Sequence, residues 1–255
     1  MEVVEFESWI LKNLNVDLSA YKPAQLHRRI KSLMNRIGVD NYVAYTELIK
    51  RDEAEQKRFL NYITINVTEF FRNPQLFFEL QKKIKEELLV NNRNLKIWSA
   101  ACSQGAEPYS LAMIMKEISP HGRHEIIATD IDEPILDRAK EGKYAYSEIK
   151  NISEELLIKY FKKKNEEYYI EPIIKNMVAF HKHDLILDDY FKNMDLIVCR
   201  NVVIYFNSSI KNEIYKKFHS ALKKGGLLFV GATESIYNYK ELGLDKVGTF
   251  IYRKI

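Results

Sequence analysis

The chain has 255 residues, 46% of them hydrophobic and 29% charged, which is enough to bury the core of one large domain and a smaller one. It has no run of about 18 apolar residues, so we expect no membrane-spanning helix. The formal charge of +4 is too small to indicate a nucleic-acid partner by itself. The two cysteines, Cys102 and Cys199, supply no disulfide framework, and no spacing of ligand residues predicts a metal site. The acidic, amphipathic N-terminus is unlike a signal peptide, so we expect a cytoplasmic protein with reduced thiols.

The part of the chain before residue 90 contains helical patterns and no strand pattern, so we expect a small all-α domain there. The second pattern is the clearest, because Pro23 suits the first turn of a helix and Gly38 suits the position after its end. The expected helices cover residues 3–14, 23–37, 41–50 and 52–63.

One side of the second expected helix is basic. Between Lys22 and Arg36 there are five Lys and Arg residues and no acidic residue. Such a face is usually only solvated surface, and the alternative is a docking surface for an acidic partner. The candidate docking residues are Arg28, Arg29, Lys31 and Arg36.

The stretch TINVTEFFRNPQLF mixes polar and aromatic residues. Asn73 followed by Pro74 predicts the start of a helix, with Asn73 as its cap. Just before it, Asn66, Thr68 and Arg72 stand among apolar residues, and buried polar groups need partners. They either cap the chain locally and leave a surface arginine, or they line a pocket at the junction of two domains.

After residue 95 strands and helices alternate, which predicts an α/β fold with a mostly parallel sheet covered on both faces. We therefore divide the chain into a helical domain at residues 1–70 and an α/β domain at residues 71–255. The region around Pro172, residues 167–180, predicts one or two short extended segments and is a candidate antiparallel excursion. The expected strands cover residues 95–101, 125–130, 194–199 and 227–231, the expected helices cover residues 107–118, 133–141, 152–162 and 208–223, and a terminal hairpin covers residues 244–253.

The stretch LKIWSAACSQGAE joins the first strand to its helix through small residues. Ala100 and Gly105 leave little bulk before the helix N-terminus, so a ligand can approach the backbone, where free N–H groups favour polar or anionic groups. A dinucleotide fingerprint has three glycines where this stretch has one. No pyrophosphate site is indicated, and an ordinary tight turn is an equal alternative.

Polar residues also follow the other strands, where ligands bind in open α/β sheets. Asp130 is placed to accept hydrogen bonds from ribose hydroxyls and Asp184 from an adenine amino group, so the set fits a nucleoside. Another strand ends at Arg200 and Asn201, with Tyr205 four residues further on. The alternatives are a helix cap for Asp130, a core ion pair for Arg200 and a plain core position for Tyr205.

The segments TINVTEFFRNP, IWSAACSQGAEPYSLA, ATDID, DLIVCRNVVIYF and LFVGATES, in this order, closely resemble the CheR family of chemotaxis protein-glutamate O-methyltransferases. The resemblance covers nearly the whole chain. It implies a class I S-adenosylmethionine-dependent methyltransferase fold, which is Rossmann-like, with S-adenosyl-L-methionine as cofactor and S-adenosyl-L-homocysteine as product. It also implies the substrate, which is glutamate side chains on the cytoplasmic helical domain of chemoreceptors.

The resemblance implies roles for individual residues. Arg72, close to the reactive end of the cofactor, and Tyr205, near the transferred methyl, are the expected catalytic residues. The family often has Gly-Glu-Glu-Pro where this chain has Gly105-Ala106-Glu107-Pro108, so we assign the acidic cofactor contact of this motif to Glu107 alone. The expected cofactor-binding residues are Asn66, Thr68, Arg72, Ala100, Gly105, Glu107, Asp130, Asp184, Leu185, Arg200 and Asn201.

The basic second helix matches the receptor-docking helix of the family, which favours the docking role for its basic residues. Some members also bind a pentapeptide at the receptor tail through an antiparallel excursion. Residues 155–180 are the candidate region here, and the sequence does not indicate whether they bind anything.

The expected reaction needs no general base, because a glutamate carboxylate is already ionised at neutral pH. This agrees with the lack of a catalytic His or Cys pattern. The Asn-Pro-Pro-Tyr motif of amino-methylating nucleic-acid enzymes is absent, so we expect no nucleic-acid partner, and we expect a monomer. The alternatives are a methyltransferase for another acceptor and a non-catalytic sensor that binds the cofactor.

Overall fold

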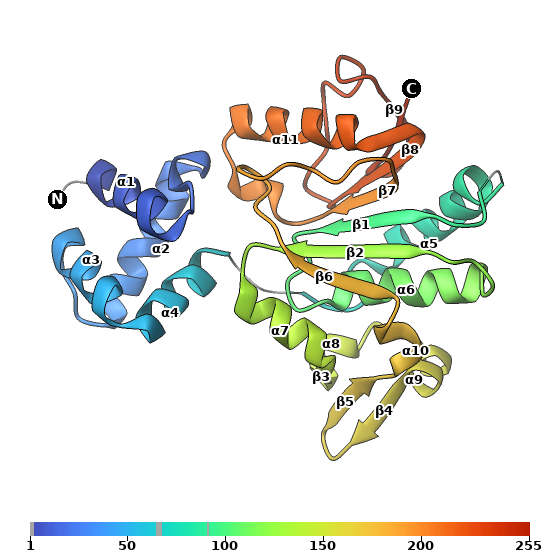
Figure 1. Ribbon diagram of the computed structural model, residues 1–255, viewed down its shortest axis with the longest axis horizontal. Coiled ribbons are helices and arrows are strands. Elements are labelled where there is room, and N and C mark those ends of the chain that lie inside the picture. The colour runs from blue at the N-terminus through green and yellow to red at the C-terminus, as the bar shows by residue number, and fades with distance from the viewer. Residues whose placement is uncertain (1–2, 65–67, 91) are drawn as a thin grey trace. The chain divides into compact units, whose positions relative to one another are not determined.

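The computed structural model describes residues 3–64, 68–90 and 92–255 (Figure 1). Its internal contacts group the chain into two units. The first contains Met1–Asn66 and Tyr205–Asn212, and the second contains Val67–Ile204 and Glu213–Ile255. The return of Tyr205–Asn212 to the first unit joins segments far apart in the chain, and no sequence pattern indicated it. The domain limits expected from the sequence stay a proposal.

The first unit is a small helical domain with an aromatic core. Phe6, Tyr45 and Phe59 contact one another, with ring centroids 5.9 to 6.1 Å apart. The second helix begins at Pro23 and buries its apolar stripe, as its pattern predicted. The elements are α1 (Val3–Leu14), η1 (Leu18–Ala20), α2 (Pro23–Arg36), α3 (Tyr42–Arg51) and α4 (Glu53–Thr64).

The second unit is built on a seven-stranded sheet in the order β6-β2-β1-β7-β8-β10-β9. Its strands pair in parallel from β6 to β8, whereas β10 runs antiparallel to both of its neighbours. The terminal hairpin expected from the sequence is therefore confirmed. The strands are β1 (Lys96–Ala100), β2 (Glu125–Asp130), β6 (Val178–Lys182), β7 (Met194–Cys199), β8 (Leu222–Val230), β9 (Leu244–Gly248) and β10 (Ile251–Lys254).

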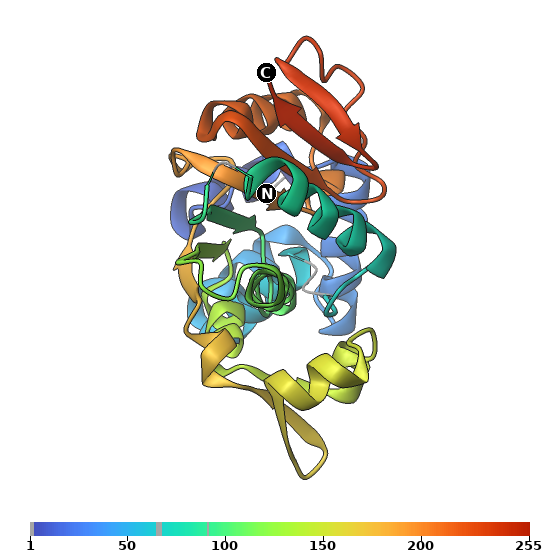
Figure 2. The same ribbon diagram turned by 90° about the vertical axis from the view of Figure 1, so that its right-hand side faces the viewer.

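Successive residues of β1 point to opposite faces of the sheet, as in any strand. Ile97 joins the large core cluster that includes Phe77 and Met113. Trp98 lies on the other face, where its ring contacts Phe218 with centroids 5.5 Å apart. Helices therefore cover both faces (Figure 2). They are α5 (Pro74–Lys83), the π-helical turn η2 (Ile84–Leu88), α6 (Ala106–Ile118), α7 (Glu133–Glu141) and α11 (Ser208–Ala221).

A second, three-stranded antiparallel sheet has the order β3-β5-β4. This confirms the antiparallel excursion, although its first strand lies before the expected region. The two short extended segments expected around Pro172 are present as β5 and β6, although Pro172 itself begins a short helix and β6 joins the main sheet instead of the excursion. The elements are β3 (Lys143–Ala145), α8 (Tyr146–Ile149), α9 (Glu154–Tyr160), β4 (Phe161–Lys164), β5 (Glu167–Ile170) and α10 (Pro172–Lys175).

Candidate functional site

The carboxyl ends of the parallel strands lie in register along one edge of the main sheet. Ala100, the last residue of β1, pairs with Thr129 of β2 and with Cys199 of β7. Cys199 in turn pairs with Val230 of β8. The residues that follow these strands therefore gather at one edge, where open α/β sheets bind their ligands.

The loop after β1 is held in left-handed backbone conformations. Ala101, Ser103 and Gly105 have φ values of +62°, +50° and +87°. A Cβ on Gly105 would lie 3.0 Å from the Cβ of Ala139 and 3.2 Å from the Tyr144 hydroxyl oxygen. Protein therefore fills the space where a side chain at this position would lie, and the glycine is needed for its φ angle and for packing. Its role in cofactor binding stays a prediction.

Asp130 closes this loop from the end of β2. Its Oδ2 accepts a hydrogen bond from the Ser103 N–H at 2.8 Å, and its Oδ1 accepts one from the Asp132 N–H at 3.1 Å. Burial raises the pKa of Asp130 to about 6, although the two N–H donors favour its charged form. The alternative of a helix cap belongs to Asp132, whose side chain accepts from the Ile135 N–H. Asp130 is thus a buried acid at the edge where a ribose is expected.

Asp184 retains one unused acceptor atom. Its Oδ1 accepts from the N–H groups of Ile186 at 2.7 Å and Leu187 at 3.3 Å, which forms a tight turn. Its Oδ2 is buried and has no hydrogen-bond partner among the described residues. Burial also raises the pKa of the Asp184 carboxyl. Leu185, beside it, is buried. An unused buried acceptor fits the amino group of an adenine, because such an atom is costly without a donor.

Ser103 supplies a second unused polar atom at this edge, since its buried Oγ has no partner among the described residues. Its main-chain N–H is already bound to Asp130. Two unpartnered polar atoms, one on Ser103 and one on the predicted site residue Asp184, therefore support a polar ligand at this edge.

Glu107 and Arg200 form a buried ion pair at the same edge. The Glu107 Oε2 lies 3.5 Å from the Arg200 Nη1, and its Oε1 accepts from the Ser99 hydroxyl at 2.8 Å. Burial raises the pKa of Glu107, and Arg200 and Ser99 partly offset the increase. The guanidinium also packs against the rings of Phe77 and Phe229, at 5.0 and 4.9 Å from their centroids. The core ion pair considered for Arg200 is therefore present.

The second terminal nitrogen of Arg200 binds the segment before α5. Its Nη2 donates to the Arg72 carbonyl at 2.8 Å and to the Asn73 Oδ1 at 3.1 Å. Asn73 has a left-handed φ of +61° and makes no side-chain cap, so the predicted cap was wrong because Arg200 uses its side chain. Thr68 is half-buried, and Asn66 lies outside the described residues.

Asn201 and the residues after it are bound by an acid that sequence reasoning missed. The Glu234 carboxylate accepts from the N–H groups of Asn201 at 2.6 Å and Val203 at 2.8 Å. A clue was available in LFVGATES, where Gly231 and Glu234 follow a strand. Tyr205 belongs to the first unit, where its carbonyl accepts from the Lys22 N–H at 2.9 Å.

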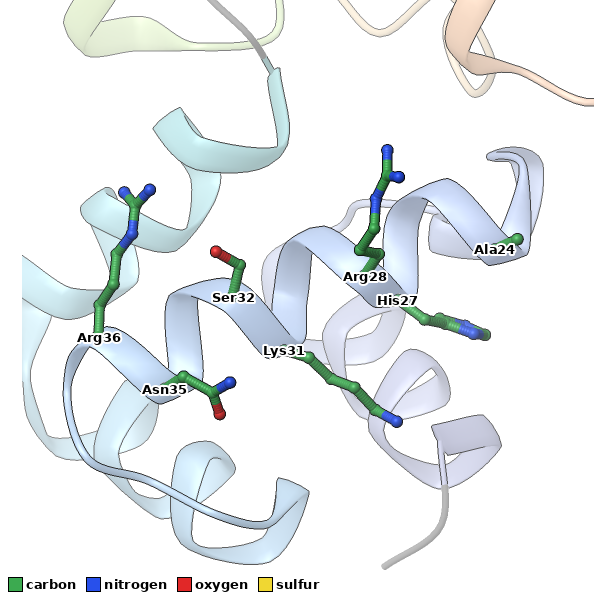
Figure 3. A pocket seen from close by; sticks show the side chains of 7 residues that line it. All are labelled: Ala24, His27, Arg28, Lys31, Ser32, Asn35 and Arg36. Carbon is green, nitrogen blue, oxygen red and sulfur yellow. The ribbon is translucent and has the colours of Figure 1, made fainter.

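The basic face of α2 borders a surface hollow within the first unit (Figure 3). Arg28, Lys31 and Arg36 line this hollow. The guanidinium of Arg29 instead lies over the ring of Tyr62, 4.8 Å from its centroid, and donates to the Tyr62 carbonyl. The guanidinium of Arg36 lies over the same ring at 5.5 Å, so Arg29 differs from the other three candidate docking residues in not lining the hollow and in its bond to the Tyr62 carbonyl.

Within the ranges that the structure describes, no three His, Cys, Asp or Glu side chains gather as a metal site. No helix found there combines the length and apolar character needed to cross a membrane.

Two family models together match nearly the whole chain. The model described as "CheR methyltransferase, SAM binding domain" matches residues 66–248, and "CheR methyltransferase, all-alpha domain" matches residues 1–64. A chemotaxis protein methyltransferase of Listeria monocytogenes is 39% identical over 250 residues, which cover 98% of this chain and 95% of the relative. A chemotaxis protein methyltransferase of Borreliella burgdorferi is 36% identical over 248 residues, which cover 91% of this chain and 87% of the relative.

Proposed function

The chain belongs to the CheR methyltransferase family, and from this premise we propose that it methylates glutamate side chains of chemoreceptors. Its cofactor is S-adenosylmethionine, and its second unit has the class I methyltransferase fold. The observation that carries the proposal is the match of both parts of the chain, in order, to the two domains of the family. The relatives' description as chemotaxis protein methyltransferases supports it.

The residues at the sheet edge suit the parts of this cofactor. Asp130 is available to accept from the ribose hydroxyls, and the unused Oδ2 of Asp184 is available to accept from the adenine amino group. The buried Glu107 carboxylate suits the ammonium of the methionine part. When bound, S-adenosylmethionine supplies an electrophilic methyl group on a positively charged sulfur.

The protein's task in this reaction is to position two reactants in a dry site. The acceptor carboxylate is ionised at neutral pH and attacks without loss of a proton. One C–O bond forms, one C–S bond breaks, and the electron pair of that bond remains on sulfur. No general base is needed, so catalysis rests on orientation and exclusion of water.

Arg72 and Tyr205 are the proposed catalytic residues. We assign Arg72 to binding a carboxylate, either that of the cofactor or that of the incoming glutamate, because its guanidinium suits bidentate contacts. The Arg72 carbonyl is bound by Arg200, which fixes the main chain from which its side chain projects. Tyr205 is assigned to shaping the path of the methyl group.

The proposed receptor-docking surface is the hollow on α2, through Arg28, Lys31 and Arg36. Three cations on one helix face suit the acidic surface of a helical partner. We assign Arg29 a supporting role, because it does not line the hollow and its guanidinium donates to the Tyr62 carbonyl of α4.

The experiment is transfer of a labelled methyl group to purified receptor fragments. We expect base-labile label on the receptor, lost when the accepting glutamates are replaced by alanine. Label on a small molecule or another protein, and none on the receptor, would indicate a different acceptor. Cofactor binding without transfer to any acceptor would indicate a sensor. Either outcome overturns the proposal.

A further inference from the structure

The Glu234 carboxylate is buried where β8 ends, and main-chain N–H groups surround it. Besides Asn201 and Val203, it accepts from Val202 at 3.0 Å, Ile204 at 3.3 Å and Gly231 at 2.8 Å. It forms no ion pair with any of the described residues, so these N–H donors compensate its burial.

The bound segment, Arg200–Ile204, follows β7 and contains two of the proposed cofactor-binding residues, Arg200 and Asn201. Arg200 pairs with Glu107 and holds the Arg72 carbonyl. Asn201 has a left-handed φ of +60°, a conformation that asparagine adopts more readily than most residues but that still needs support. The next residue after the segment is Tyr205. One carboxylate therefore binds the backbone beside several proposed site residues.

The turn that carries Glu234 is itself held in place. The Glu234 N–H donates to the Gly231 carbonyl at 2.9 Å, and its carbonyl accepts from the Tyr215 hydroxyl at 3.4 Å. The Ile236 N–H donates to the Tyr252 hydroxyl at 3.0 Å. The carboxylate is thus presented from a fixed turn and is not a flexible surface acid.

Gly231 is matched to this arrangement. A Cβ built on Gly231 would lie 2.2 Å from the Glu234 Oε2 and 3.0 Å from the Asn201 nitrogen. The first distance is shorter than any tolerated contact, so a side chain here would displace the carboxylate. The glycine is needed for the close approach of the carboxylate, and not for an unusual φ angle.

We infer that Glu234 is a positioning residue, which holds the Arg200–Ile204 segment in the conformation that binds S-adenosylmethionine. The inference concerns cofactor binding, so it rests on the family's cofactor and not on which acceptor is methylated. It predicts that loss of the carboxylate weakens cofactor affinity beyond any effect on folding.

The test is the Kd of S-adenosylhomocysteine, measured by calorimetry at a temperature where circular dichroism shows each variant folded. Glu234→Gln replaces one accepting oxygen by an amide that donates, so it opposes at least two N–H groups. We expect its Kd to rise by about tenfold or more. Glu234→Asp keeps the charge on a shorter side chain. Its Kd should lie between that of Glu234→Gln and that of the unchanged protein.

The matched control is Asp195→Asn. Asp195 is also a buried acid, and it belongs to β7. It accepts hydrogen bonds from the Lys96 N–H at 2.7 Å and from the Lys223 Nζ at 2.7 Å. It lies near the opposite, amino end of the strand. We expect this variant to lose stability while its Kd stays within about twofold. An equal loss of affinity in the control would reduce the Glu234 effect to general instability and overturn the inference.

Two further measurements keep the inference testable if Glu234→Gln does not fold. Gly231→Ala should also weaken binding, because it displaces the carboxylate without altering it. In the unchanged protein, the amides of residues 201–204 should exchange slowly with solvent deuterium before cofactor is added. Fast exchange at these amides, or unchanged affinity in folded Glu234→Gln, would overturn the inference, whatever acceptor the enzyme uses.

Discussion

The guanidinium of Arg200 donates to the main-chain carbonyl of Arg72 at 2.8 Å, across 128 residues of sequence. The contact joins the end of β7 to the segment that leads into α5. It uses the main chain of Arg72 and not its side chain. The guanidinium proposed to act in catalysis is therefore distinct from the group that orders the loop, and the two functions can be separated by mutation.

Replacing Arg72 by alanine tests the catalytic function. The carbonyl that Arg200 binds is retained in this variant, so the fold should survive. Methyl transfer should fall by about two orders of magnitude or more, because the carboxylate loses its bidentate partner. Initial rates with labelled cofactor measure the loss, and Arg93→Ala, an exposed arginine of the same unit, is the control. Near-normal turnover of Arg72→Ala would remove Arg72 from the mechanism.

Replacing Arg200 by methionine tests the ordering function. The apolar side chain can still pack against Phe77 and Phe229, but Glu107 is left buried without its cationic partner. We expect the free energy of unfolding to fall by about 3 kcal/mol, since removing one member of a buried pair leaves an uncompensated charge. Urea denaturation provides the measurement.

Arg253→Met is the matched control for this change. Arg253 also pairs with two acids, Glu87 and Asp245, but its side chain is 41% exposed. Replacing Arg253 should lower the free energy of unfolding by less than about 1 kcal/mol, because exposed ion pairs contribute little to stability. A second variant, Arg200→Met combined with Glu107→Gln, should regain part of the stability. Equal losses at Arg200 and Arg253 would contradict the buried ion pair.

The pKa of Asp130 predicts a pH dependence of cofactor binding. Burial raises this pKa to about 6, and the ionised form is the better acceptor for ribose hydroxyls. The Kd of S-adenosylhomocysteine should therefore increase as the pH falls through about 6, by up to about tenfold at pH 5. Asp130→Asn should bind more weakly and lose this dependence. A Kd that is flat from pH 5 to about pH 8 in the unchanged protein would contradict the role.

Asp130 should affect the stability of the fold with the opposite pH dependence, so that low pH favours stability while high pH favours cofactor binding. Because the folded-state pKa is raised above the value of 3.8 for the free side chain, the contribution of Asp130 to stability is complete below about pH 4. That contribution is lost as the pH rises through about 6. Urea denaturation between these pH values should show that the free energy of unfolding of Asp130→Asn increases relative to that of the unchanged protein as the pH rises.

Charge reversal on α2 tests the docking surface. Arg28→Glu combined with Lys31→Glu should weaken receptor methylation by about tenfold or more, because both residues line the basic hollow. The Kd of S-adenosylhomocysteine should be unchanged. The control is Arg51→Glu, at an exposed arginine that ends α3 in the same unit. Equal loss of methylation and cofactor affinity would count against docking.

The sequence by itself determined the local structure and the residue types at the strand ends. Continuous apolar strands alternating with helical patterns predicted the parallel sheet, and Pro23 and the terminal strands were interpreted correctly. These features depend on residues that are close in the sequence, so periodicity and capping rules can predict them. The motifs at the strand ends also indicated the family, because they are short runs of neighbouring residues.

Only the tertiary structure decided which partners those residues use. The side chain of Asn73 accepts from Arg200 and not from its own helix. Gly105 packs against Ala139, and Glu234 binds the backbone of a segment more than 30 residues away in the chain. Such choices depend on contacts between distant segments, where a stronger donor or a closer neighbour displaces the local partner. Sequence patterns record spacing along the chain, and these contacts exist only after the strands have aligned.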